Sequence, residues 1–288
     1  MRACSPLLVA GWFSVAIATA GVCLAGEEDS PSLEDMRAWI VQLDDDDFGT
    51  RERATQNLVK AGSAAIDLVA RAIPSGGPEV RLRGFTILSQ LALKTDEPTA
   101  QHVDMALSKL ASSPNGQVAE QAAKLRKSFQ QQRRDRAIAS IRRHGGSVST
   151  DGDTIDRVEI REGWTAGDEG LRCLRALPDV TWISLEDSSI TDAGLTHIAE
   201  LENLTHLYLG HSQVQGPGLV HIKRLPKLVH LSLRYMAVED KWLRHVGEMH
   251  SLQSLGLDDT KVTDDSVQLL ATLPNLQWLW LDRSQVTG

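Results

Sequence analysis

A 24-residue unit repeats without insertion through the second half of the chain, starting at Thr181, Thr205, Val229, Gln253 and Gln277. Within each unit the apolar residues first alternate, as in "LTHLYL", and then take helical spacing, as in "LTHIAEL". Each unit is therefore predicted to be a short strand, a turn and a short helix.

Apolar columns run through these units in register. One column contains Ile183, Leu207, Leu231, Leu255 and Leu279. A second contains Leu185, Leu209, Leu233, Leu257 and Leu281. A single unit cannot bury such side chains alone, so the units are expected to stack into a solenoid with one continuous core.

The spacing L-x-x-L-x-L, as in Leu204, Leu207 and Leu209, resembles the leucine-rich repeat, and "ITDAGL" resembles its ribonuclease-inhibitor or F-box-associated type. The resemblance implies an α/β solenoid with a parallel concave sheet and convex helices. We expect Thr191 or Asp192 to cap the convex helix of its own unit. A degenerate earlier unit starts near Arg157.

The N-terminal half has helical patterns throughout, and "FGTRERATQNLVKAG" and "PEVRLRGFTILSQLA" resemble HEAT-like repeats. We expect an all-α HEAT-like domain over residues 26–130 and a basic linker helix over 131–146. Residues 147–288 would form the leucine-rich repeat domain, whose first end is covered by a hairpin turning at Asp151-Gly152. The combination resembles exported proteins of planctomycete-type bacteria.

The first 25 residues contain Arg2 as their one charge and an apolar run from Leu7 to Ala25. This pattern predicts a signal peptide cleaved after Ala25, with an uncleaved membrane anchor as the alternative. We therefore expect an exported protein, located in the periplasm or cell envelope or secreted.

Three cysteines bear on the compartment. Cys4 and Cys23 would leave with the signal peptide, so Cys173 would have no intramolecular disulfide partner. An exported chain without a disulfide favours a bacterial envelope compartment. We expect Cys173 to pack in the core.

The sequence carries no catalytic constellation, with no G-x-S-x-G, H-E-x-x-H, P-loop or paired C-x-x-C motif. The net charge of −8 argues against nucleic acid as a partner. We expect no enzyme activity, no cofactor and no metal site. His197, His221 and His245, which share one position on the convex helices, are interpreted as solvated.

The residues between the core leucines are expected to face solvent on the concave sheet, because strand side chains alternate. The predicted partner-binding residues are Trp182, Glu186, His206, Tyr208, His230, Arg234, Asp258, Trp278 and Trp280. Aromatic side chains among charges are typical of protein interfaces. The sequence thus predicts a non-enzymatic scaffold for a protein or peptide. A glycan-binding envelope protein that stacks sugars on the Trp and Tyr rings is the alternative.

The strand expected over residues 277–282 has no following unit in this sequence. Its unpaired edge, with Trp278 and Trp280 beside it, predicts either a homodimer through edge-to-edge pairing or fraying of the last unit. A membrane contact is expected only if the N-terminal segment is uncleaved.

Overall fold

The computed structural model describes residues 31–93, 96–151 and 154–287. The predicted signal peptide, with Cys4 and Cys23, and the hairpin residues Gly152 and Asp153 lie outside the described residues. Within the described ranges, no helix is both long enough and apolar enough to cross a membrane. The chain divides into two compact units between Ala106 and Leu107, and each is described by itself.

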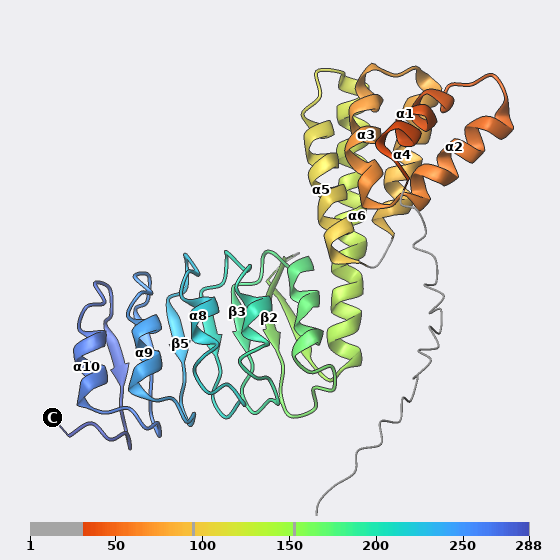
Figure 1. Cartoon of the computed structure of the whole chain (residues 1–288). Helices are drawn as coiled ribbons and strands as arrows, with labels where there is room; N and C mark the ends of the chain where they lie inside the picture. The colour runs from red at the N-terminus through yellow and green to blue at the C-terminus, as the bar shows by residue number, and fades with distance from the viewer. Residues whose placement is uncertain (1–30, 94–95, 152–153, 288) are drawn as a thin grey trace, which may run out of the picture. The chain divides into compact units, whose positions relative to one another are not determined.

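The first unit is built from helices (Figure 1). They are α1 (Leu33–Gln42), α2 (Phe48–Lys60), α3 (Ser63–Ser75), α4 (Pro78–Ala92) and α5 (Glu97–Ala111), the last of which runs past the unit's boundary. Asp47 caps α2 by accepting a hydrogen bond from the Thr50 N–H at 2.7 Å. Pro78 lies in the first turn of α4, where its missing N–H costs nothing.

The second unit begins with the end of α5 and with α6 (Gly116–Arg143), followed by the antiparallel hairpin of β1 (Ser147–Asp151) and β2 (Thr154–Glu159). The basic segment that was expected to be a separate linker helix is the second half of the longer α6. Ala137 and Ile141 on this half join the same core as the repeats. Both α6 and the hairpin therefore belong to the first end of the solenoid.

The repeats supply five parallel strands of three residues each. They are β3 (Trp182–Ser184), β4 (His206–Tyr208), β5 (His230–Ser232), β6 (Ser254–Gly256) and β7 (Trp278–Trp280). Together with the hairpin they form one sheet in the order β1-β2-β3-β4-β5-β6-β7. Partners in adjacent strands are 24 residues apart, so the sheet keeps the register of the sequence repeat.

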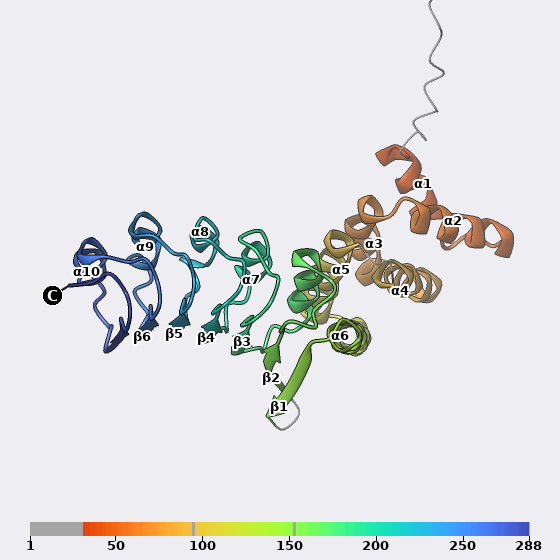
Figure 2. The same ribbon diagram turned by 90° about the horizontal axis from the view of Figure 1, so that it is seen from below.

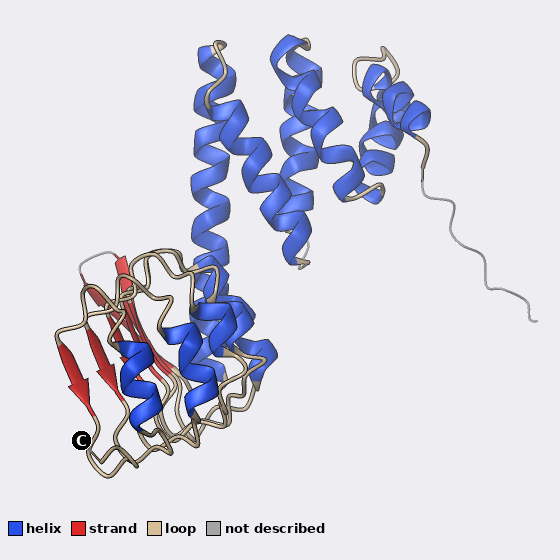
Figure 3. Ribbon diagram, turned by 60° about the vertical axis from the view of Figure 1, so that its left-hand side comes forward, coloured by secondary structure: helices blue, strands red, loops and turns tan. Residues whose placement is uncertain are grey.

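Short helices follow the strands. They are the 3₁₀ helix η1 (Asp168–Ala176), α7 (Leu195–Ile198), α8 (Leu219–Ile222), α9 (Asp240–Val246) and α10 (Asp264–Leu270). Figures 2 and 3 show the helices α7–α10 in a layer on one face of the sheet. The columns of Leu207 and Leu209 lie between the two layers and are buried except for their last members, Leu279 and Leu281, which are partly buried. The predicted leucine-rich repeat architecture is therefore confirmed for this unit.

Each strand ends in the same turn. The residues after it with positive φ, between 53° and 60°, are Asp187, His211, Tyr235, Asp259 and Arg283. This conformation is uncommon for residues other than glycine. It is held by a repeated backbone hydrogen bond, such as that from the Asp187 N–H to the Gly210 carbonyl at 3.0 Å. Stacking of the units thus fixes a turn that the local sequence alone would not select.

The expected cap by Asp192 is wrong in its direction. Helix α7 has Gly194 at its N-cap and no side-chain cap. Asp192 instead accepts hydrogen bonds from backbone N–H groups of the next unit, at 3.1 Å from Gly216 and 2.7 Å from Gly218. Asp240 does the same, accepting from the Thr263 N–H at 2.8 Å. These aspartates therefore join neighbouring units.

The expectation that His197 is solvated is also wrong. Its side chain is 8% exposed, and Nδ1 is buried without a hydrogen-bond partner in the described part of the chain. Burial lowers the pKa of His197 below its usual 6.5, which Arg175 and Arg172 reinforce while Glu169 opposes. His221, at the same position one unit later, is exposed as predicted.

We expect the free energy of unfolding to fall as the pH drops below about 6.5, because the unfolded chain then binds a proton that folded His197 resists. The loss is complete once the pH is below the lowered pKa of the folded state. Urea unfolding of His197→Gln between pH 7 and pH 5 should show a weaker pH dependence than the unsubstituted chain. His221→Gln is the matched control, and an equal effect of both substitutions would contradict the assignment.

Candidate functional site

The sheet face opposite α7–α10, here called the open face, carries side chains in three rows. Row one contains Trp182, His206, His230, Ser254 and Trp278. Row two contains Ser184, Tyr208, Ser232, Gly256 and Trp280. Row three, directly after the strands, contains Glu186, Gly210, Arg234, Asp258 and Asp282. The rows are a direct consequence of strand alternation within a sheet of constant register.

Row one begins with a packed cluster of rings. The Arg157 guanidinium lies 4.2 Å from the centroid of the Trp182 ring, and the Tyr208 ring is 5.1 Å from it at a tilt of 41°. Trp182 is therefore covered on more than one side and only partly exposed. Its role as a freely accessible contact residue, which the sequence predicted, is not what the structure shows.

His206 and His230 form a stacked pair in the same row, with ring centroids 4.2 Å apart and planes at 21°. Burial lowers the pKa of His206, and the neighbouring His230 and Arg157 lower it further. His206 therefore favours its neutral form near pH 7. No third ligand joins them, and the described residues contain no group of three or more side chains suited to hold a metal ion.

A hollow of ≈ 140 Å³ opens where rows one and two carry their smallest residues, on β5 and β6. Ser232, Ser254 and Gly256 form its floor, and Tyr208, His230, Arg234 and Trp280 are among the residues around it. The two serine side chains are 7% and 3% exposed, and neither Oγ atom has a hydrogen-bond partner within the described residues. The hollow thus has polar atoms at its base and rings at its sides.

Row three carries the charges. Arg234 Nε lies 2.5 Å from Asp258 Oδ2, and Asp258 Oδ1 accepts the Asp282 backbone N–H at 2.8 Å. Asp258 is only 2% exposed, so its predicted availability to a partner is wrong. The arginine covers it, because the Arg234 side chain crosses the space that Gly256 leaves free. Glu186, which is partly exposed, accepts a long hydrogen bond from the Ser184 hydroxyl at 3.4 Å.

At the end of the sheet face, Trp278 is 61% exposed and Trp280 is 45% exposed. Both project from β7, as the alternation predicted. Together with Tyr208 and His230 they place large rings on either side of the small residues of β5 and β6. The sequence analysis did not identify this hollow. The pattern that could have indicated it is a group of small residues, Ser232, Ser254 and Gly256, among aromatic residues at equivalent positions of neighbouring units.

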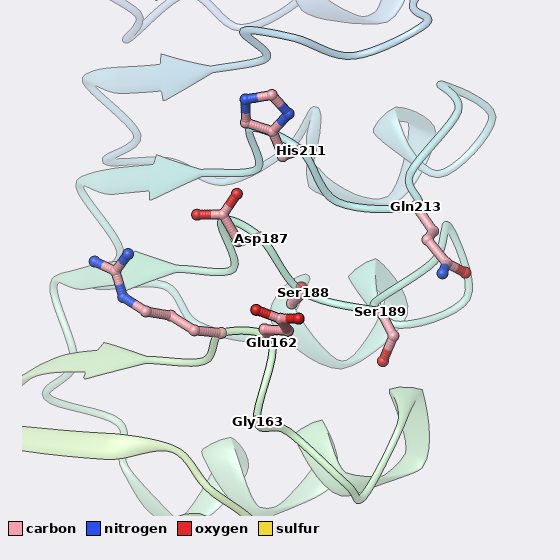
Figure 4. A pocket seen from close by; sticks show the side chains of 8 residues that line it. Glu162, Gly163, Asp187, Ser188, Ser189, His211 and Gln213 are labelled. Atoms are coloured by element: carbon pink, nitrogen blue, oxygen red, sulfur yellow. The ribbon is translucent and has the colours of Figure 1, made fainter.

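A second, wider hollow of ≈ 620 Å³ lies beside the turns that follow β2, β3 and β4 (Figure 4). Polar and charged residues line it, namely Arg161, Glu162, Gly163, Asp187, Ser188, Ser189, His211 and Gln213. The Asp187 and His211 side chains come from equivalent turns of successive units. The His211 ring stacks on that of Tyr235 at 4.3 Å and 8°, so it continues a column of turn side chains.

Three side chains with nucleophilic atoms are not activated by their surroundings. Cys173 is partly buried, and burial raises the pKa of its thiol to about 11, which leaves it protonated and a poor nucleophile at pH 7. Within the described residues, the hydroxyls of Ser232 and Ser254 have no base in hydrogen-bond contact.

Comparison with known proteins gives structural likeness only. No family model and no curated protein matches the chain. Among solved structures, internalin C2 from Listeria monocytogenes is 30% identical with a TM-score of 0.35, covering 41% of this chain and 48% of its own. The actin-binding site 2 of leiomodin-1 is 18% identical with a TM-score of 0.37, covering 51% of this chain and 86% of its own.

The C-terminal domain of Caenorhabditis elegans tropomodulin is 16% identical with a TM-score of 0.37, covering 49% of this chain and 92% of its own. The chain spans about half the length of internalin C2.

Proposed function

We propose that this chain is a non-enzymatic scaffold that binds a protein or peptide on the open face of its leucine-rich repeats. The observation that carries the proposal is the ring-walled hollow on β5 and β6, whose floor holds polar atoms without partners. Buried polar atoms of this kind are stabilised by a ligand that supplies their hydrogen bonds. Exposed Trp280 and partly exposed Tyr208 beside them are the residue types that dominate protein interfaces.

A peptide suits the open face better than a glycan does. The glycan alternative relies on stacking along Trp182, Tyr208, Trp278 and Trp280, and Arg157 already lies over the Trp182 ring. Row three also offers charges of both signs, with Arg234 and Asp282 exposed. We expect affinity for a peptide to fall as salt is added, whereas sugar stacking would be nearly independent of salt.

The substitution Trp280→Ala is expected to weaken peptide binding by about 30-fold, since hot-spot aromatic residues contribute about 2 kcal/mol or more. Peptides selected from a randomised displayed library against the full chain are the probe, and titration calorimetry is the measurement. Tyr208→Ala should act in the same direction, and the far-UV circular dichroism should stay unchanged in both variants.

His221→Ala, on the exposed side of α8, is the control and should leave the affinity unchanged. Selected peptides that bind both open-face variants as tightly as the unsubstituted chain would contradict the proposed function. A library that yields no binding peptide, together with salt-independent binding of an oligosaccharide to the full chain, would favour the glycan function instead.

We extend the proposal to the rest of the chain. The packing of neighbouring helices in the first unit, α1 with α2 and α3 with α4, supports a HEAT-like array. The apolar run from Leu7 to Ala25 supports export to a bacterial envelope or beyond, as in planctomycete-type proteins. N-terminal sequencing of the protein recovered outside the cytoplasm tests this, because cleavage after Ala25 would leave Gly26 as the first residue.

A further inference from the structure

The hollow on β5 and β6 is a slot between two rings in one row. Row two reads Tyr208, Ser232, Gly256 and Trp280 across four adjacent strands. Strands lie about 4.8 Å apart, so the Cα atoms of Tyr208 and Trp280 are about 14 Å apart. The two residues between them are small, and the Arg234 side chain lies over Gly256, so a planar group between the walls enters beside Arg234.

The floor of the slot requires a partner that can both donate and accept hydrogen bonds. The Oγ atoms of Ser232 and Ser254 are buried and unpartnered in the described part of the chain. Each hydroxyl has one donor and two acceptor sites. Both hydroxyls are already buried in the chain, so their desolvation cost of about 1–3 kcal/mol for each group is offset only by a ligand that supplies hydrogen bonds. A purely apolar occupant is therefore disfavoured.

The charges around the slot favour an uncharged occupant. Arg234 is paired with Asp258, and the carboxylate of Asp282 follows in the same row. A carboxylate entering the slot would approach both aspartates, and a cation would approach Arg234. His230, at the side of the slot, adds a polar ring. The residues beside the slot thus select for a neutral group with a hydroxyl.

We propose that this slot receives the ring of a tyrosine side chain from the bound partner, with its hydroxyl at Ser232 and Ser254. The ring packs against Tyr208 and Trp280, where aromatic pairs contribute about 0.5–1.5 kcal/mol beyond their buried area. The volume of ≈ 140 Å³ accommodates one ring. This inference rests on the proposed function, since it identifies the residue that anchors the peptide.

A sugar ring shares part of this chemistry and is the competing occupant. An oligosaccharide would use several stacking rings in succession, yet the Arg157 guanidinium already lies over the Trp182 ring. The loss of that stacking surface favours one anchoring side chain of a peptide.

The test compares N-acetyl-tyrosine amide with N-acetyl-phenylalanine amide, which differ by one hydroxyl. Each is titrated into the full chain while the backbone amide signals of Ser254 and Gly256 are followed by NMR. We expect the tyrosine compound to shift these signals and to bind about tenfold more tightly, as one net hydrogen bond to a buried hydroxyl implies. Equal affinity of the two compounds would overturn the proposal.

The double substitution Ser232→Ala with Ser254→Ala removes both hydroxyls that are proposed to bond the tyrosine hydroxyl. We expect the preference for tyrosine over phenylalanine to fall to about twofold or less, because phenylalanine then leaves no serine hydroxyl unpaired and the tyrosine hydroxyl has lost its two partners. Ser184→Ala is the matched control, since Ser184 lies in the same row but already donates to Glu186. A tenfold preference that survives in the double variant would overturn the proposal.

Methyl glucopyranoside, titrated in the same way, distinguishes the sugar from the side chain. Tighter binding of the glucoside than of the tyrosine compound at Ser254 and Gly256 would overturn the proposal.

Failure of this inference differs from failure of the proposed function. Selected peptides that bind the open face without an essential tyrosine would remove only the inference, whereas a tyrosine-specific slot with no peptide binder would remove only the function.

Discussion

Replacing Leu207 with alanine is expected to lower the free energy of unfolding by about 2–5 kcal/mol, the range for truncating a buried leucine. Leu207 is fully buried between the sheet and the helical layer. Its strand partners Ile183 and Leu231 belong to the same column, so the cavity would open in the middle of the stack. Urea unfolding followed by circular dichroism measures the change.

Leu269→Ala is the control, because Leu269 lies on α10 and is 38% exposed. Its effect should stay within about 0.5 kcal/mol, as for other surface positions. Similar losses for Leu207→Ala and Leu269→Ala would contradict the core described here. If instead Trp280→Ala or Tyr208→Ala destabilised the fold as Leu207→Ala does, those rings would be core residues and the open face would be misassigned.

The second large effect is expected for Asp192→Ala, at about 2–4 kcal/mol. One carboxylate accepts backbone N–H groups from Gln215, Gly216 and Gly218, and a hydrogen bond to a charged group contributes about 1.5–3 kcal/mol. Gly216 and Gly218 are buried, so their N–H groups would lose their partner away from water. The free energy of unfolding in urea is again the measurement.

Asp192→Asn keeps the carbonyl acceptor that faces Gly218 and should recover part of the loss. Both substitutions would be nearly neutral if Asp192 were a solvated residue. A cap for its own helix α7 would instead cost about 1 kcal/mol, the usual value for a lost N-cap. A loss of that size would contradict the bridge between units.

The sequence predicted the strands, the helices and the buried columns of the repeat unit because these depend on period alone. Strand alternation placed Leu207 and Leu209 on the same face of the sheet, and both are buried against the helical layer. The same argument placed Tyr208 and Trp280 on the other face of the strands. Local alternation and a constant repeat length were sufficient for both results.

The errors concern residues whose surroundings come from a neighbouring unit. Asp192 has N–H donors both in its own unit and in the next, and only the stacking distance decides between them. His197 lies on a helix of four residues, so contacts beyond that helix bury it. Asp258 is covered because Arg234 extends across Gly256, a packing choice that no periodicity encodes.

The sequence analysis did not identify the hollow, although its small residues and the rings beside them stand in adjacent columns of the repeat. The alternation gave only the direction of Ser232, Ser254 and Gly256. It could not give the burial of the two hydroxyls or their lack of hydrogen-bond partners in the described chain, which depend on neighbouring units. The sequence therefore predicted which side chains lie on the open face, and the structure located the slot within it.

Photo-crosslinking tests the central claim that the open face binds a peptide. A peptide selected against the full chain would carry a benzophenone group at one position, and mass spectrometry would identify the crosslinked residues. We predict crosslinks within 206–211, 230–235, 254–259 and 278–283, the segments that form rows one to three and their turns. Crosslinks confined to α7–α10 or to the helices of residues 33–92, with none in the sheet segments, would contradict the account.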